Sequence, residues 1–174
     1  MGIQFETDYN METLTAMAKV LRKTVRKKRS RRVHIFAAVV LVLGLLTILA
    51  TTAGGEPLGA SGVVTLLAML VVILVSLFED KLNAWFARKR LLPGTEHAAA
   101  TFEEDGYVSA TGVTESRFSY AQIVAVAETA RYFVFALSSC HTQAYDKRTI
   151  RGGSVDDFRA FIAEKAGKLV ENIK

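Results

Sequence analysis

Two long apolar runs are the feature that most constrains how this chain can fold. Residues 33–52 carry no ionisable side chain except His34 at one end, and residues 58–78 carry none. About 20 such residues cross a hydrocarbon core of roughly 30 Å as a helix. A core helix of a soluble protein would show a polar stripe or end after about 14 residues. The sequence therefore predicts two transmembrane helices.

A short connection, residues 53–57, joins the two runs. Gly54, Gly55 and Pro57 disfavour helix there, so the spans must form an antiparallel hairpin over residues 33–78. A cleaved signal peptide is a poor alternative. The first run is too long for a signal's apolar core, begins after 32 residues and is followed by a second span.

The formal net charge of +5 is concentrated beside these spans. Residues 1–32 carry +6 and residues 79–90 carry +2, whereas residues 91–174 carry −2. Basic flanks stay in the cytoplasm, which predicts cytoplasmic termini and an external loop. Without interleaved aromatics, a basic segment against a span favours anionic lipid headgroups over nucleic acid. The interface cations predicted in the first segment are Arg26, Lys27, Lys28, Arg29, Arg31 and Arg32.

The stretch 79–94 is predicted to continue the second span as a juxtamembrane helix and linker. Leu82, Trp85 and Phe86 fall on one helical face, and Pro93-Gly94 ends the segment. An indole prefers the membrane boundary, whereas cations prefer the water beside it. The predicted interface residues here are Trp85, Arg88, Lys89 and Arg90.

The N-terminal part of residues 1–32 combines a strand signal with an amphipathic helix. Ile3 and Phe5 alternate with polar residues, and Asn10 is a suitable N-cap. The helix, expected to run into the first span, has an apolar stripe of Leu14, Met17, Ala18, Leu21 and Val25. We interpret the stripe as packing on the chain's own globule or the membrane surface, with a dimerisation seam as the alternative. Because an isolated strand is marginal, residues 2–7 are expected to join the C-terminal sheet.

Residues 95–174 have the pattern of a small α+β domain. Six short strands lie between residues 97 and 147, with connections too short for crossover helices, so they must be antiparallel. Ser154 and Asp157 begin a helix whose expected buried face is Phe158, Phe161, Ile162, Lys165 and Leu169. A bent antiparallel sheet capped by a C-terminal helix is the plan of a pleckstrin-homology (PH)-like half-barrel. The fold class is thus membrane α+β, a transmembrane hairpin plus this half-barrel.

Four motifs add a resemblance. They are the FEEDGYVSATG turn from Phe102, the SRFSYAQIVAVAETARYFVF stretch from Ser116, the YDKRTI strand from Tyr145 and the VDDFRAFIAEK helix from Val155. With the preceding hairpin they resemble the YcxB-like family of bacterial membrane proteins. That family often has Trp near Tyr120 and Pro at Asp146, where this chain differs. The resemblance implies a two-span inner-membrane protein with a cytoplasmic PH-like domain, and it implies no biochemical activity.

The sequence offers little catalytic chemistry. His34, His97 and His141 have no partner at metal-binding spacing, and the single cysteine, Cys140, cannot form an intramolecular disulfide. Cys140 and His141 are expected on opposite faces of a strand, with Cys140 buried, so a nucleophilic dyad is disfavoured. We predict no catalytic residue, no metal and no cofactor.

One anion or partner contact is a weaker candidate. Gly152-Gly153-Ser154 opens a helix, where backbone N–H groups favour an anion. The residues proposed for that contact are Lys147, Arg148, Arg151 and Ser154. Ordinary capping of the helix by Ser154 is the simpler interpretation.

Two functional hypotheses follow. The first is a non-enzymatic protein that anchors a binding or regulatory domain at the inner membrane, where an unidentified protein or lipid headgroups are its partner. The alternative is a subunit of an oligomeric assembly, a pore or a transporter accessory, because Ala37, Ala38 and Gly44 permit close helix contact. An enzyme is the least supported of the classes considered.

Overall fold

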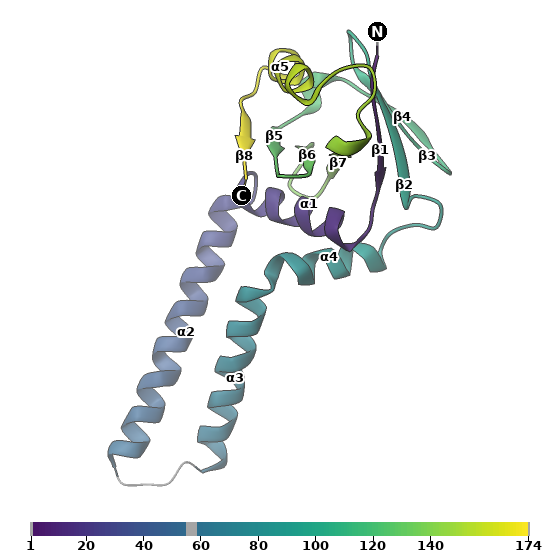
Figure 1. The fold of residues 1–174 in the computed structure, drawn as a ribbon. Coiled ribbons are helices and arrows are strands. Elements are labelled where there is room, and N and C mark those ends of the chain that lie inside the picture. Colours follow the sequence, from purple (N-terminus) through teal and green to yellow (C-terminus); the bar gives the residue numbers. More distant parts are fainter. Residues whose placement is uncertain (1, 55–58, 174) are drawn as a thin grey trace.

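The computed structural model describes residues 2–54 and 59–173, which form an α+β globule on a long helical hairpin (Figure 1). The hairpin helices are α2 (Lys27–Ala53) and α3 (Ala60–Leu77), both long and apolar enough to cross a membrane. Their apolar side chains point outward, with Phe36 70% exposed and Leu77 73% exposed. The two predicted apolar helices are confirmed. Residues 55–57 of the predicted loop, and Leu58, lie outside the described residues.

Small side chains let the two hairpin helices approach each other. A Cβ atom on Gly44 of α2 would lie 2.8 Å from Sδ of Met69 on α3. Gly44 therefore allows close packing of α2 on α3 within the hairpin. This contact accounts for one of the three small residues that suggested association between chains.

The helix expected to run from the N-terminal segment into the first span is interrupted, so that prediction is wrong. Helix α1 (Met11–Lys23) ends at Thr24, whose hydroxyl donates to the Val20 carbonyl at 2.8 Å. The Arg26 amide then donates to the Leu21 carbonyl at 2.8 Å, which turns the chain before α2. The second span has a similar break at Phe78, after which α4 (Glu79–Lys89) begins.

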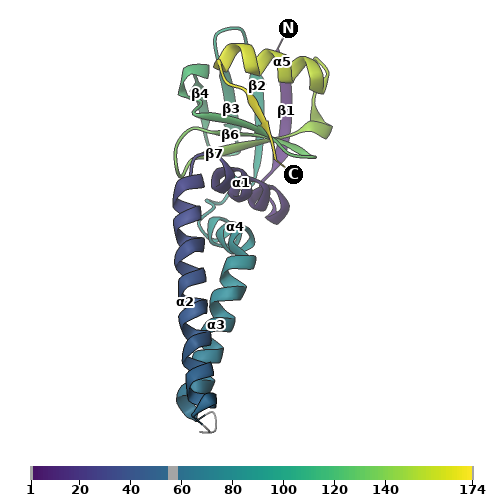
Figure 2. The ribbon, with the colours of Figure 1, turned by 90° about the vertical axis from the view of Figure 1, so that its left-hand side faces the viewer.

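These two breaks turn α1 and α4 across the hairpin axis. In both ribbon views the two helices lie next to each other between the globule and the hairpin (Figures 1 and 2). Helix α1 has the predicted N-cap, because Oδ1 of Asn10 accepts hydrogen bonds from the backbone amides of Glu12 and Thr13, at 2.9 and 3.0 Å.

Two four-stranded sheets build the globule. The first, in the order β1 to β4, contains β1 (Ile3–Asp8), β2 (His97–Phe102), β3 (Tyr107–Thr111) and β4 (Glu115–Phe118). The second has the order β7-β6-β5-β8, from β5 (Ala125–Glu128), β6 (Tyr132–Ala136), β7 (Thr142–Asp146) and β8 (Val170–Asn172). The 3-10 turns η1 (Tyr120–Gln122) and η2 (Lys147–Thr149) and helix α5 (Val155–Ala166) complete it.

The predicted pairing of the N-terminal strand is confirmed. Strand β1 lies antiparallel to β2 along its full length, from Ile3 opposite Phe102 to Asp8 opposite His97. The six predicted strands are present, and the α+β class is confirmed with its C-terminal helix. The assignment of this arrangement to the PH-like class stays a prediction.

The C-terminal helix is shorter than the sequence suggested. Gly167 adopts the left-handed conformation with φ of +59° and ends α5, as glycine commonly does at this position. The chain then forms β8, which pairs in parallel with β5. Leu169 is consequently 89% exposed, so its predicted place on the buried helical face is wrong.

Strand β6 is buried on both of its faces. Phe133 and Phe135 pack into the core under α5, whereas Tyr132 and Val134 pack on the opposite side with Val20 of α1. The Thr13 hydroxyl also donates to the Tyr132 hydroxyl at 3.1 Å. Val20 and Thr13 lie beside the predicted stripe; of the stripe itself, Met17 packs against the same cluster, and Leu14 and Leu21 are buried. The choice between packing of the stripe and a dimerisation seam stays a prediction.

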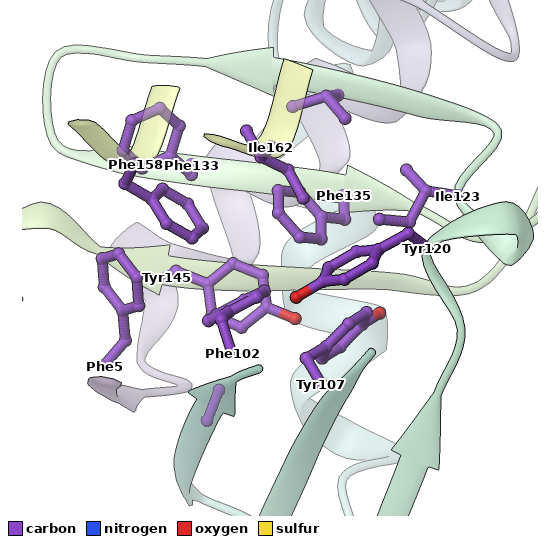
Figure 3. Packing of buried hydrophobic residues seen from close by; sticks show 12 residues of the cluster. Phe5, Phe102, Tyr107, Tyr120, Ile123, Phe133, Phe135, Tyr145, Phe158 and Ile162 are labelled. Atoms are coloured by element: carbon purple, nitrogen blue, oxygen red, sulfur yellow. The ribbon is translucent and has the colours of Figure 1, made fainter. Parts of the chain in front are cut away.

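Phe5 of β1 joins the aromatic core shown in Figure 3. Its ring centroid lies 4.7 Å from that of Phe158 and 5.7 Å from those of Phe102 and Tyr145. Residues 3–23 and 97–173 therefore share one packed body, and the hairpin is an insertion between them.

The substitution Phe5→Ala is expected to lower the free energy of unfolding by about 3–5 kcal/mol, because it leaves a cavity among buried rings. Denaturant unfolding of the full chain in detergent, followed by near-ultraviolet circular dichroism, measures this change. Leu169→Ala is the control and should have little effect. A Phe5→Ala variant as stable as the parent would contradict the assignment of β1 to the core.

Candidate functional site

An ion pair joins α1 to α4 at the place where the globule meets the hairpin. Arg22, in the last turn of α1, donates from Nε and Nη2 to the two carboxylate oxygens of Asp80, both at 2.7 Å. Both side chains are partly buried, at 27% and 18% exposure. Asp80 lies in the first turn of α4, and each charge suits the dipole of its own helix end. This bidentate pair fixes the two crossing helices against each other.

Glu79 and His34 extend the polar contact to the first hairpin helix. Oε2 of Glu79 is buried, lies 3.8 Å from Nε of Arg22, and has no hydrogen-bond partner among the described residues. The same oxygen lies 3.7 Å from Nε2 of His34. Nδ1 of His34 lies 2.9 Å from the Ser30 carbonyl oxygen, one turn earlier on the same helix.

A cavity of about 570 Å³ opens beside these groups, and we name it the junction cavity. Its walls come from α1, the start of α2, α4 and the turn before β7. Each helix contributes one face. Along α1 the lining residues include Leu14, Met17 and Leu21, and along α4 they include Glu79, Asn83 and Phe86. The three- and four-residue steps are those of one helical face.

Arginines from distant segments meet at the junction cavity. Arg26 and Arg29 come from the start of α2 and Arg90 follows α4. None of the three forms an ion pair with a residue in 2–54 or 59–173, and Arg29 and Arg90 are exposed. Nε of Arg26 donates to the Ser139 carbonyl at 2.5 Å, which orients its guanidinium. Sequence reasoning did not find this grouping.

The remaining predicted interface residues lie on the outer surface. Trp85 is 44% exposed, and the Lys89 ammonium lies 3.7 Å from the centre of its ring, a cation–π contact. The other predicted interface cations, all exposed, are Lys27, Lys28, Arg31, Arg32 and Arg88. The structure therefore divides the predicted set into three cavity arginines and an exposed remainder.

The four residues proposed for an anion contact each have an acidic partner. Nζ of Lys147 lies 2.6 Å from Oε1 of Glu128, Arg148 pairs with Asp146 at 2.9 Å, and Arg151 lies 3.4 Å from Glu6. The Ser154 amide donates to Oδ2 of Asp157 at 3.0 Å, and the Asp157 amide donates to the Ser154 hydroxyl. This capping box confirms the simpler interpretation of Ser154.

Glu128 is the most strongly held carboxylate of the globule. It is 7% exposed. Its carboxylate accepts hydrogen bonds from Nε and Nη2 of Arg159, at 2.6 and 2.7 Å, and from the Lys147 ammonium. The Arg159 hydrogen bonds, followed by those of Lys147, lower the pKa of Glu128 from 4.5 to about 2. The cluster joins β5 to η2 and α5, which is a structural role.

The environment of Cys140 differs from the prediction. Cys140 is exposed and not buried, because residues 138–141 form a turn. The Ser138 hydroxyl accepts the amides of Cys140 and His141 at 3.2 and 3.0 Å, which stabilises that turn. His97, also exposed, has Nδ1 2.8 Å from Oδ1 of Asp8. Within the described part of the chain, no three His, Cys, Asp or Glu side chains gather as metal ligands would.

Comparison with known proteins adds a family relationship for part of the chain. A model of the family described as YcxB-like protein matches residues 102–162. The match extends from the end of β2 into α5 and confirms the resemblance over that segment. Comparison with curated proteins and with solved structures gave no significant match. The junction cavity is lined in part by helices outside the matched segment.

A double-mutant cycle tests the ion pair between α1 and α4. Arg22→Gln and Asp80→Asn should each destabilise the folded chain. The double variant should lose less than the sum, with a coupling energy of about 1–2 kcal/mol for a partly buried bidentate pair. Denaturant unfolding of the full chain in detergent measures the free energy of unfolding of the parent, both single variants and the double variant. Strictly additive effects would show that the pair does not hold the helices together.

Glu128→Gln tests the buried cluster through its pH dependence. The folded-state pKa of Glu128 is below its ordinary value, so the ionised carboxylate stabilises the fold above about pH 4.5 and ceases to do so near pH 2. We expect the variant to be about 3 kcal/mol less stable at neutral pH. That difference should shrink as the pH falls from 4.5 towards 2. A difference that stays constant with pH would contradict the assignment.

Proposed function

We propose that this chain is a non-enzymatic protein of the bacterial inner membrane whose hairpin anchors a cytoplasmic PH-like binding or regulatory domain. The observation that carries the proposal is the apolar hairpin itself. Along α2 and α3 the large apolar side chains face outward, where water would make them costly and lipid would not. The same helices would have no reason to stay exposed in an aqueous protein.

The charge distribution supports an orientation with both chain ends in the cytoplasm. Basic residues cluster where α2 begins and where α4 ends, which is the end of the hairpin nearest the globule. By the positive-inside rule, this end faces the cytoplasm. The exposed cations there also suit an anionic membrane surface, and each contributes about 1 kcal/mol near such lipids.

The rigid junction supports a role in positioning. Helices α1 and α4 lie between globule and hairpin, and the Arg22–Asp80 pair ties one to the other. The globule is therefore held at a set position at the membrane surface and not on a flexible tether. Such a placement suits a domain that receives a protein partner or recognises headgroups. We propose no catalytic residue and no cofactor for it.

The oligomeric assembly remains an alternative proposal. Its support is that the two apolar helices contain no Asp, Glu, Lys or Arg between residues 33–54 or 59–78, so one hairpin offers no ionisable path for a solute. Ala38 is exposed on α2 and available for contact with another helix. The mass of the detergent-solubilised chain decides between the two, because a clean monomer excludes the assembly.

Cysteine labelling tests the membrane topology. In a Cys140→Ser background, a single cysteine is placed at Glu56 in the connection or at Glu104 on the globule. A membrane-impermeant maleimide added to spheroplasts should label Glu56→Cys at once, and Glu104→Cys only after the membrane is permeabilised. Glu104 is a suitable reporter, since its side chain is 82% exposed. The opposite labelling pattern would overturn the proposed orientation, and release of the chain by alkaline carbonate would overturn membrane insertion.

A further inference from the structure

The junction cavity carries more positive charge than its surroundings balance. Arg26, Arg29 and Arg90 line it without an acidic partner in the described chain, whereas most arginines of the globule are paired. Like charges gathered around one space repel each other, and an anion placed between them removes that repulsion. The cavity is therefore electrostatically complementary to an anion.

The backbone at the start of α2 also favours an anion. Helix α2 begins at Lys27. Its N-cap, Arg26, makes no side-chain capping hydrogen bond within the described chain, and its first turn holds no acidic residue. Cations at this end oppose the positive pole of the helix dipole. An anion beside Arg26 and Arg29 would interact favourably with both the side chains and the helix end.

Glu79 is the acid among the lining residues, and Arg22 beside it is shared with Asp80. Oε2 of Glu79 is buried and lies near Arg22 and His34. Arg26, Arg29 and Arg90 then stand against the single carboxylate of Glu79, so the lining keeps an excess of two positive charges.

The other half of the lining is apolar, which a small inorganic anion would not need. The apolar lining residues include Leu14, Met17 and Leu21 of α1, together with Val33 and Phe86. Val33 is the first residue of the uncharged run, so the cavity lies where the proposed membrane boundary begins. A ligand with an anionic group at one end and an apolar body at the other matches both halves.

From these observations we propose that the junction cavity binds the phosphate of one anionic phospholipid from the cytoplasmic leaflet. Arg26, Arg29 and Arg90 would contact the phosphate, because the planar guanidinium donates two hydrogen bonds to phosphate oxygens. The glycerol and first acyl carbons lie against Val33 and Phe86. This inference rests on the proposed membrane function and adds a defined site to the diffuse attraction of the exposed cations.

Native mass spectrometry of the full chain in neutral detergent tests the proposal. With phosphatidylglycerol added, we expect one lipid per chain to be retained, about tenfold more strongly than phosphatidylcholine. The triple substitution Arg26→Gln, Arg29→Gln and Arg90→Gln should lower that retention about tenfold. The matched control, Lys28→Gln, Arg31→Gln and Arg32→Gln, removes the same charge from exposed positions outside the cavity and should retain the lipid.

Several outcomes would overturn the site. Equal losses in both triple variants would show diffuse attraction only, and no loss in the cavity variant would place the lipid elsewhere. Displacement of the lipid by millimolar inorganic phosphate would show a site for free phosphate. Should the cavity triple fail to fold by circular dichroism, Arg90→Gln alone, at an exposed position, replaces it and should weaken retention severalfold. Unchanged retention in that variant would contradict the proposal.

The same variants separate this inference from the proposed function. The cavity triple should show the same maleimide labelling pattern as the parent, because the hairpin is untouched. If the parent chain shows the expected labelling pattern but retains no phosphatidylglycerol, the site is refuted and the membrane proposal stands. An incorrect topology in the parent would refute the membrane proposal and the site together.

Discussion

The pairing of β1 with β2 is the contact on which the rest of the structure depends. A single strand is marginal in water, and β1 is stable because it completes a sheet and places Phe5 among buried rings. The chain that leaves β1 forms α1, which covers the second face of β6 through Val20. The chain therefore leaves one packed body after α1, forms the hairpin, and returns to the same body at β2.

This insertion explains the geometry at the junction. Because α1 is fixed on the globule and α4 returns beside it, residues some 60 positions apart are brought to one place. The Arg22–Asp80 pair fixes this crossing, and the space beside it becomes the junction cavity. Arg26 and Arg29 of one basic cluster and Arg90 of the other thus line one cavity.

Local signals predicted much of the fold. The apolar runs gave both hairpin helices, the Glu104–Gly106 turn gave the β2–β3 hairpin, and the Ser154–Asp157 capping box gave the start of α5. Features set by tertiary contacts were missed. The sequence did not predict the break at Thr24, the pairing of β8 with β5 after Gly167, or the turn at residues 138–141 that exposes Cys140. The cavity required distant helices to meet, and no local pattern in the sequence indicates that meeting.

Hydrogen exchange of the backbone amides tests the central claim, that both ends of the chain form one core around the inserted hairpin. In the full chain in detergent, the paired amides of β1 should exchange as slowly as those of β6, through the same global opening. Amides of residues 3–8 that exchange at the rate of an unstructured peptide, while β6 stays protected, would contradict the claim.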